Sequence, residues 1–244
     1  MRIHLVLKKE ELQPELLPGK EAVVFDVLLA TTVITAVLAA GAKRVCPVLD
    51  EEEAKLKHAD PDAKDAMLVG EKNGLLIDGF HMPSPTQLSE TVKGKDIILS
   101  TTNGTVALRK SEEAERVYAS SLLNNETIAR ELLRQGNDDI VMVCAGSTGQ
   151  FCLEDFYGAG HLVAHLASHT EITCNDAALT AWKFYQSCPE KPVDLLKQAR
   201  VGHMLSAHGF AQDLSFAAEA GNLDVVPVVA SDGWITDEGG KTNG

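Results

Sequence analysis

The chain has 244 residues, and 35 acidic against 22 Lys and Arg side chains give it a formal charge of −13 with histidine neutral. Its 45% hydrophobic and 23% charged residues are typical of an ordinary globular protein, which argues against disorder, collagen-like repeats and coiled coils. The negative charge repels phosphate backbones and anionic lipid heads, and the chain has no dense Lys/Arg run. We therefore expect no nucleic-acid partner and no membrane partner.

Targeting signals and cysteine spacing bear on where the protein works. The N-terminus lacks a signal-peptide core, and no apolar run approaches the ~18 residues that span a bilayer. The five cysteines are an odd number, and none of them shows the two-residue gap of a zinc or redox pair. We expect a cytoplasmic protein with reduced thiols.

Apolar segments of strand length alternate with segments of helical period along most of the chain. The predicted strands cover residues 3–7, 22–27, 44–48, 66–70, 96–100, 116–119, 139–144 and 223–229. The predicted helices cover residues 32–40, 51–58, 84–91, 104–110, 124–135, 153–168, 175–186 and 193–207. Several strands are apolar on both faces, which is typical of a sheet that helices cover on both sides. The pattern predicts a three-layer α/β sandwich with a mainly parallel β-sheet, in a single domain over residues 1–232.

Local signals mark helix ends and irregular segments. Asn124 and Asn175 are predicted N-caps, and Gly41 and Gly136 are predicted to end the helices before them. Gly, Pro and Asn residues predict that 71–87 is a long ordered loop without regular structure. The Gly-rich and charged segment 233–244 is predicted to be a flexible tail.

Ligands of doubly wound sheets bind beyond the carboxyl ends of the strands. Four polar clusters follow predicted strands: residues 25–32 (FDVLLATT), 70–80 (GEKNGLLIDGF), 100–105 (STTNGT) and 144–155 (CAGSTGQFCLED). We expect these clusters to meet at one edge of the sheet.

The first two clusters offer carboxylates. Asp26 is a candidate to hold Mg²⁺ or to attack phosphorus, and Thr31 and Thr32 at a helix start suit an anion; helix capping is the alternative. Glu71 is a candidate metal ligand or general base beside a turn at Asn73, and a solvated glutamate in an ordinary turn is the alternative.

The third cluster predicts a cradle for phosphate or sulfonate, because hydroxyl and amide donors precede a helix N-terminus. Its members are Ser100, Thr101, Thr102, Asn103, Gly104 and Thr105. An ordinary Asn-Gly turn with a Ser/Thr cap is the alternative.

The fourth cluster combines backbone donors around Gly146 with two carboxylates, Glu154 and Asp155, that suit a hard divalent cation. Stabilisation by the helix dipole is the alternative for this acidic pair. Cys144 lies where cysteine-dependent phosphatases place their nucleophile, but their arginine six positions on is Gln150 here, so that mechanism is disfavoured.

His161, His165 and His169 recur every four residues on a predicted helix. Such a row could hold zinc, although a solvated or interface face is the stronger interpretation because a further ligand is missing nearby. If the row is an interface, a homodimer follows.

Taken together, the clusters predict a Mg²⁺-dependent enzyme that acts on a small phosphorylated acid. In this order, their motifs resemble the 2-phosphosulfolactate phosphatase (ComB-like) family, clearly over residues 23–160 and more weakly over 208–227. The resemblance implies an α/β fold, Mg²⁺, and hydrolysis of (R)-2-phospho-3-sulfolactate to 3-sulfolactate and phosphate, a step of the coenzyme M biosynthesis type. The site residues that it implies are Asp26, Thr31, Thr32, Glu71, Asn73, Ser100, Thr101, Thr102, Asn103, Cys144, Gly146, Glu154 and Asp155.

The chain departs from the family pattern at two places. Leu29 stands where the family usually has an arginine, which would be a natural phosphate or sulfonate clamp. Residues 79–87 read GFHMPSPTQ where the family tends to have Asn-Ser-Pro. Two alternatives therefore stay open: a phosphatase for a different small phosphorylated carboxylic acid, and a non-catalytic protein that binds a small anion.

The mechanism that we expect places Mg²⁺ on carboxylates among Asp26, Glu71, Glu154 and Asp155, with residues 100–105 holding the non-bridging oxygens. Either a water molecule activated by Glu71 or Asp155 attacks, or Asp26 forms a phospho-enzyme.

Overall fold

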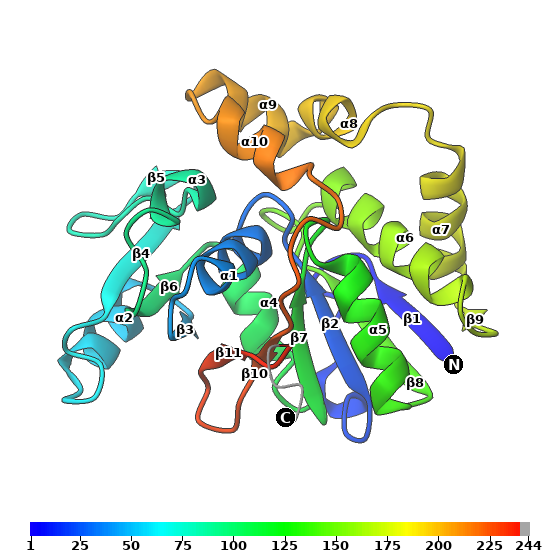
Figure 1. Ribbon diagram of the computed structural model, residues 1–244, viewed down its shortest axis with the longest axis horizontal. Coiled ribbons are helices and arrows are strands. Elements are labelled where there is room, and N and C mark those ends of the chain that lie inside the picture. Colours follow the sequence, from blue (N-terminus) through cyan, green and yellow to red (C-terminus); the bar gives the residue numbers. More distant parts are fainter. Residues whose placement is uncertain (240–244) are drawn as a thin grey trace.

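The computed structural model describes residues 1–239, and it is an α/β fold built on one large sheet (Figure 1). The strands follow the order β5-β4-β6-β3-β11-β10-β7-β2-β8-β1-β9 across the sheet. Their bounds are β1 (Arg2–Val6), β2 (Glu21–Phe25), β3 (Arg44–Val48), β4 (Met67–Lys72), β5 (Leu75–Leu76), β6 (Asp96–Ser100), β7 (Arg116–Ser120), β8 (Asp139–Cys144), β9 (Thr173–Cys174), β10 (Pro227–Val229) and β11 (Ile235–Asp237).

Most neighbouring strands pair in parallel. Parallel pairing holds for β4, β6 and β3, and again from β7 through β2, β8 and β1 to β9. The antiparallel hairpin of β10 and β11 lies between these two groups, and β5 adds an antiparallel edge to β4. The predicted α/β fold with a mainly parallel sheet is confirmed.

Helices cover both faces of the sheet. They are α1 (Ala30–Ala39), α2 (Glu51–Ala59), α3 (Pro85–Leu88), α4 (Gly104–Lys110), α5 (Asn125–Gln135), α6 (Leu153–Ala167), α7 (Asp176–Ser187), α8 (Pro192–Gln198), α9 (Arg200–Ala207) and α10 (Ala211–Ala217), with a short 3-10 helix at Pro14–Leu16. Helices α1 and α4 pack with Val24 of β2, whereas α5, α6 and α7 pack with Val23 and Phe25 on the opposite face. Successive residues of β2 thus meet different helices, and all are buried, which explains why the segment is apolar on both faces.

Helices α8, α9 and α10 form a cap over the carboxyl ends of the strands (Figure 1). Leu196, Leu205 and Leu214 of the cap pack in one apolar cluster with Leu28, which follows β2, and with Tyr157 of α6. None of the helices within residues 1–239 is long and apolar enough to cross a membrane.

One long helix was predicted for residues 193–207, and the structure has two helices there instead. Ala199 has an extended backbone (ψ 148°) that ends α8 and starts α9. A Cβ atom on Gly202 would lie 1.8 Å from the Leu196 carbonyl oxygen, so glycine lets the backbone of α9 pass close to the end of α8.

The prediction that 71–87 lacks regular structure is wrong in part. Strands β4 and β5 form a short hairpin through Asn73 and Gly74, and both residues have positive φ values, as a tight turn requires. Helix α3 (Pro85–Leu88), with Ser84 as its N-cap, confirms the start of the helix predicted for 84–91 but ends earlier.

The prediction of a flexible tail over 233–244 is wrong for its first residues. Trp234 and Ile235 are buried, and Ile235–Asp237 forms β11 inside the sheet. Bulky apolar side chains outweigh the glycines there, because their burial stabilises the pairing with β3 and β10. Residues 240–244 lie outside the described residues.

The helix-end signals are confirmed at three positions. Asn175 caps α7 by accepting from the Ala178 N–H (2.9 Å), and Gly41 and Gly136 follow α1 and α5 with φ values of 91° and 73°. Asn124 precedes α5, but its side chain makes no capping hydrogen bond; its amide joins Ser121 and the carbonyl of Val225 instead.

The first histidine of the row on α6, His161, points into the interior of the molecule. His161 is buried, and its ring Nε2 lies 2.9 Å from Nε2 of His165, while Nδ1 lies 3.1 Å from the Asn125 amide. Tyr185 of α7 packs against the His161 ring. Burial lowers the pKa of His161 to about 3, and the neighbouring His165 adds to the effect. The prediction of a solvated or interface face is therefore wrong for His161, because α5 and α7 of the same chain cover it.

His161 should make the protein acid-sensitive. Its pKa is lower in the folded state than in the unfolded chain, so its contribution to stability is present above about pH 6.5 and is lost as the pH falls toward 3. We expect urea unfolding of the wild type to lose about 2 kcal/mol more between pH 7 and pH 5 than unfolding of His161→Gln. The exposed His169→Gln should follow the wild type, and parallel curves for all three proteins would contradict the expectation.

Candidate active site

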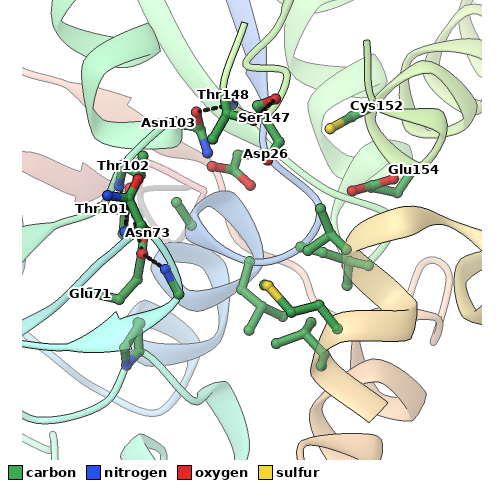
Figure 2. A pocket seen from close by; sticks show the side chains of 18 of the residues that line it. Asp26, Glu71, Asn73, Thr101, Thr102, Asn103, Ser147, Thr148, Cys152 and Glu154 are labelled. Atoms are coloured by element: carbon green, nitrogen blue, oxygen red, sulfur yellow. Dashed lines mark hydrogen bonds between the residues drawn. The ribbon is translucent and has the colours of Figure 1, made fainter. Parts of the chain in front are cut away.

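A cavity of about 230 Å³ lies between the carboxyl ends of the strands and the cap (Figure 2). Residues that follow β2, β4, β6 and β8 line one side of it, and α9 lines the other. The four predicted clusters therefore meet at one place, as the topology rule for parallel sheets requires.

Asp26 lines the cavity directly after β2, an interior strand that pairs with β7 and β8. Its backbone carbonyl accepts from the N–H and the hydroxyl of Thr31 (3.0 and 2.9 Å), and the hydroxyl of Thr32 donates to the Val27 carbonyl (2.8 Å). Both threonines are fully buried and do not line the cavity. The structure thus places them in the turn that orients Asp26, and not at the predicted anion site.

A glycine lets α4 approach the Asp26 carboxylate. A Cβ atom on Gly104 would lie 2.5 Å from Asp26 Oδ2 and 2.4 Å from the Ala30 side chain. Any other residue would have to push the first turn of α4 away from the carboxylate. Gly104 therefore contributes to the site through close packing.

The Asp26 carboxyl group has a pKa raised to about 7. Burial is the largest cause, and the charges of Glu71 and Glu154 raise the pKa further. The Ala30 backbone N–H and the charge of Lys9 act in the opposite direction. A buried carboxylate that neighbouring carboxylates repel is a typical sign of a functional site.

Glu71 ties two walls of the cavity together. Its Oε1 accepts from the Thr102 N–H (2.8 Å), and its Oε2 accepts from the Thr102 hydroxyl (3.0 Å) and the Gly74 N–H (2.7 Å). The Thr102 hydroxyl also accepts from the Asn73 N–H (2.8 Å). Both carboxylate oxygens of Glu71 therefore accept hydrogen bonds that join β4 to the loop after β6, and its role as a general base stays a prediction.

Of the predicted cradle, three residues line the cavity: Thr101, Thr102 and Asn103. Ser100 and Thr105 are buried behind them. The Thr105 hydroxyl donates to the Thr101 carbonyl (3.0 Å) and accepts from the Thr101 N–H (3.1 Å), so it closes the turn onto itself.

The two acidic residues that begin α6 have different surroundings. Glu154 is buried and lines the cavity (Figure 2), and burial raises its pKa. Asp155 does not line it; its oxygens accept from the N–H groups of Val27 (2.9 Å) and Gly146 (3.1 Å). Burial and the charge of Asp26 raise the pKa of Asp155. Asp155 thus joins the loops after β2 and β8.

The four predicted metal ligands, Asp26, Glu71, Glu154 and Asp155, do not gather into one ligand set. Within residues 1–239, no group of three or more His, Cys, Asp or Glu side chains is arranged to hold a metal ion. Two carboxylates, Asp26 and Glu154, line the cavity and do not have both oxygens engaged in hydrogen bonds.

Cys144 lies outside the cavity lining. It is fully buried in the apolar cluster under α6, and burial raises the pKa of its thiol well above the usual value. A thiol of this kind stays protonated and is a poor nucleophile, which is a further reason to disfavour the cysteine mechanism. All five cysteines are free thiols in the structure.

Sequence reasoning missed two cations at the site. Arg200 at the start of α9 is the one Lys or Arg among the described residues that line the cavity, and it donates to the Ser147 carbonyl (3.1 Å). Lys9 after β1 is buried and donates to Asn103 Oδ1 (2.8 Å). Neither lies in a motif, and both reach the site only through folding.

The fold and the cavity thus define an α/β protein with a carboxylate and amide site at the carboxyl ends of its strands. The model of the 2-phosphosulpholactate phosphatase family matches residues 6–232, so the chain belongs to this family of phosphoric monoester hydrolases.

Three relatives from bacteria carry the name probable 2-phosphosulfolactate phosphatase. The relative from Symbiobacterium thermophilum is 41% identical over 88% of this chain and 93% of its own length. Those from Clostridium perfringens (strain SM101) and Carboxydothermus hydrogenoformans are each 37% identical over 93% of this chain and 92% of their own length.

The raised pKa of Asp26 predicts that this carboxylate destabilises the metal-free fold. Its folded-state pKa lies above the unfolded value of 3.8, so stability is full below about pH 4 and is lost as the pH rises through 7. In EDTA at pH 8, Asp26→Asn should raise the free energy of unfolding by about 1–4 kcal/mol, and the gain should vanish near pH 4. Urea unfolding measures this, with the exposed Asp78→Asn as the matched control. A variant that is less stable than the wild type at pH 8 would refute the assignment.

Proposed function

We propose that the protein hydrolyses (R)-2-phospho-3-sulfolactate to 3-sulfolactate and inorganic phosphate with Mg²⁺. This is a reaction of the coenzyme M biosynthesis type, and we place it in the cytoplasm. The observation that carries the proposal is the pair of buried carboxylates, Asp26 and Glu154, facing one cavity beside the amide and hydroxyl groups of residues 101–103. Family membership and the names of the relatives support the substrate.

The donor set at the cavity fits Mg²⁺. This ion takes oxygen ligands, usually one or two carboxylates together with water and substrate phosphate oxygens. Asp26 and Glu154 supply such a pair, and their mutual repulsion favours a cation between them. Bound Mg²⁺ would neutralise charge on the phosphoryl group as the P–O bond breaks.

The chain's own residues orient the phosphoryl group toward Asp26. Asn103 and the loop at Ser147 and Thr148 lie beside the Asp26 carboxylate (Figure 2), and Thr101 lines the same cavity. Hydroxyl and amide donors there bind the non-bridging oxygens of phosphate. Glu71 and Asp155 already accept hydrogen bonds at both oxygens, which leaves Asp26 and Glu154 as the carboxylates that face the phosphoryl group.

Arg200 supplies the cation that binds an acid group of the substrate. Leu29 lines the cavity at the position where the family usually has an arginine, so a guanidinium from that position is absent. Arg200 lies on the wall formed by the cap, where its charge counteracts the raised pKa of Glu154. A guanidinium fork binds carboxylate or sulfonate through two parallel hydrogen bonds.

Phosphate release from 2-phosphosulfolactate, 2-phospholactate and phenyl phosphate, each with Mg²⁺ and with EDTA, tests the proposal. We expect Mg²⁺-dependent release that favours the sulfonate, and a loss of at least about 100-fold in kcat for Asp26→Asn, with Asp78→Asn unchanged. Preference for 2-phospholactate would identify a different phosphorylated acid as the substrate. Phosphate release that EDTA does not affect would refute the requirement for Mg²⁺. No release from any of the three compounds would favour an anion-binding protein.

The same panel tests Arg200. Arg200→Gln should lower the ratio of kcat/KM for 2-phosphosulfolactate over phenyl phosphate by about 10-fold or more, because only the first substrate has acid groups besides its phosphate. Lys197→Gln removes one positive charge from an exposed position on α8 and serves as the matched control. An unchanged ratio in Arg200→Gln would contradict this role.

A further inference from the structure

Lys9 places a buried ammonium group next to Asn103, which lines the cavity. Its side chain is 8% exposed, and charged lysines are almost never buried without partners. The ammonium donates to Asn103 Oδ1 (2.8 Å) and to the Ala145 carbonyl (3.3 Å), and it pairs with Glu10 (3.0 Å). Lys9 therefore links the segment after β1 to the loops after β6 and β8.

The contacts of Lys9 determine how the Asn103 amide is oriented. Asn103 Oδ1 accepts from the Lys9 ammonium and from the Thr148 N–H (3.2 Å). An ammonium and a backbone N–H can only donate, so both must meet the amide oxygen and not the amide nitrogen. The Nδ2 group then faces the other way, and Figure 2 shows the Asn103 nitrogen on the side of Asp26.

The charge of Lys9 also acts on the carboxylate of Asp26. It opposes the rise in the pKa of Asp26 that burial, Glu71 and Glu154 cause. A phosphoryl group in the cavity would add further negative charge near these carboxylates. A buried cation behind the amide favours binding of that anion, because the surroundings screen its charge less than water does.

We propose that Lys9 is a positioning residue: it holds the Asn103 amide so that Nδ2 donates to a non-bridging oxygen of the phosphoryl group. Lys9 does not line the cavity, so it acts through Asn103. The inference rests on the proposed function in one respect, that the ligand carries a phosphate group.

The test compares Lys9→Met with Lys8→Met. Methionine keeps the apolar stem of Lys9 and removes its donors. Lys8 is the matched control, because its ammonium contacts the Gly149 carbonyl (3.3 Å) and Glu11, and not Asn103. The probes are inorganic phosphate and orthovanadate, and their binding is measured by titration calorimetry with Mg²⁺ present. We expect Lys9→Met to weaken binding by about 10- to 100-fold, as for the loss of a charged hydrogen bond, and Lys8→Met by less than about threefold.

A double-mutant cycle separates positioning from a merely structural role. In an Asn103→Ala background, Lys9→Met should cost less than about threefold in phosphate binding, because its effect passes through Asn103. A structural role would lower binding equally in both backgrounds. If Lys9→Met fails to fold, Lys9→Gln, whose side-chain NH2 can still donate without the charge, takes its place and should give an intermediate loss.

The outcomes distinguish the inference from the proposed function. Equal losses in both backgrounds, or unchanged phosphate binding in Lys9→Met, would overturn the positioning role. Coupling between Lys9 and Asn103 without turnover of 2-phosphosulfolactate would leave the inference intact and refute the substrate. A wild-type protein that binds neither phosphate nor vanadate would refute both.

Discussion

The site depends on one constraint: the carboxylate of Asp26 is held, buried, at the end of the interior strand β2. Strand β2 is covered on both faces, so the chain that leaves it has a single direction, into the turn that Thr31 closes. The Ala30 N–H at the start of α1 donates to this carboxylate, and Gly104 lets α4 approach it. The neighbouring loops are then arranged around a group that water no longer solvates.

This arrangement explains why the loops are tied to one another by carboxylates. Glu71 joins the loops after β4 and β6, and Asp155 joins those after β2 and β8, in each case by accepting backbone N–H groups. Such bonds stabilise the walls, while Asp26 and Glu154 remain turned toward the cavity (Figure 2). The repulsion among these groups costs stability, which a cation bound to Asp26 and Glu154 would offset.

Much of the fold was predictable, because buried strands and amphipathic helices have clear periods in the sequence. The four clusters were also predictable as site components, since they follow strands whose carboxyl ends meet. Which residue of a cluster lines the cavity was not predictable: Thr31 and Thr105 have the same chemistry as Thr101, but they are buried behind the lining to which Thr101 belongs.

The two cations escaped sequence reasoning for a different reason. Lys9 lies in a short run of charged residues (8–11) and Arg200 lies outside the four clusters, and only the tertiary structure brings them to the site. The break at Ala199 and the strand Ile235–Asp237 were missed likewise, because packing against other segments determines them and local composition does not.

The most direct test of this account is a crystal structure of the protein with Mg²⁺ and orthovanadate. The account predicts a metal ion bound by the carboxylates of Asp26 and Glu154, and a vanadate oxygen within hydrogen-bond distance of Asn103 Nδ2. A metal ion or vanadate bound away from Asp26, or an Asn103 amide that turns its oxygen toward the vanadate, would contradict it.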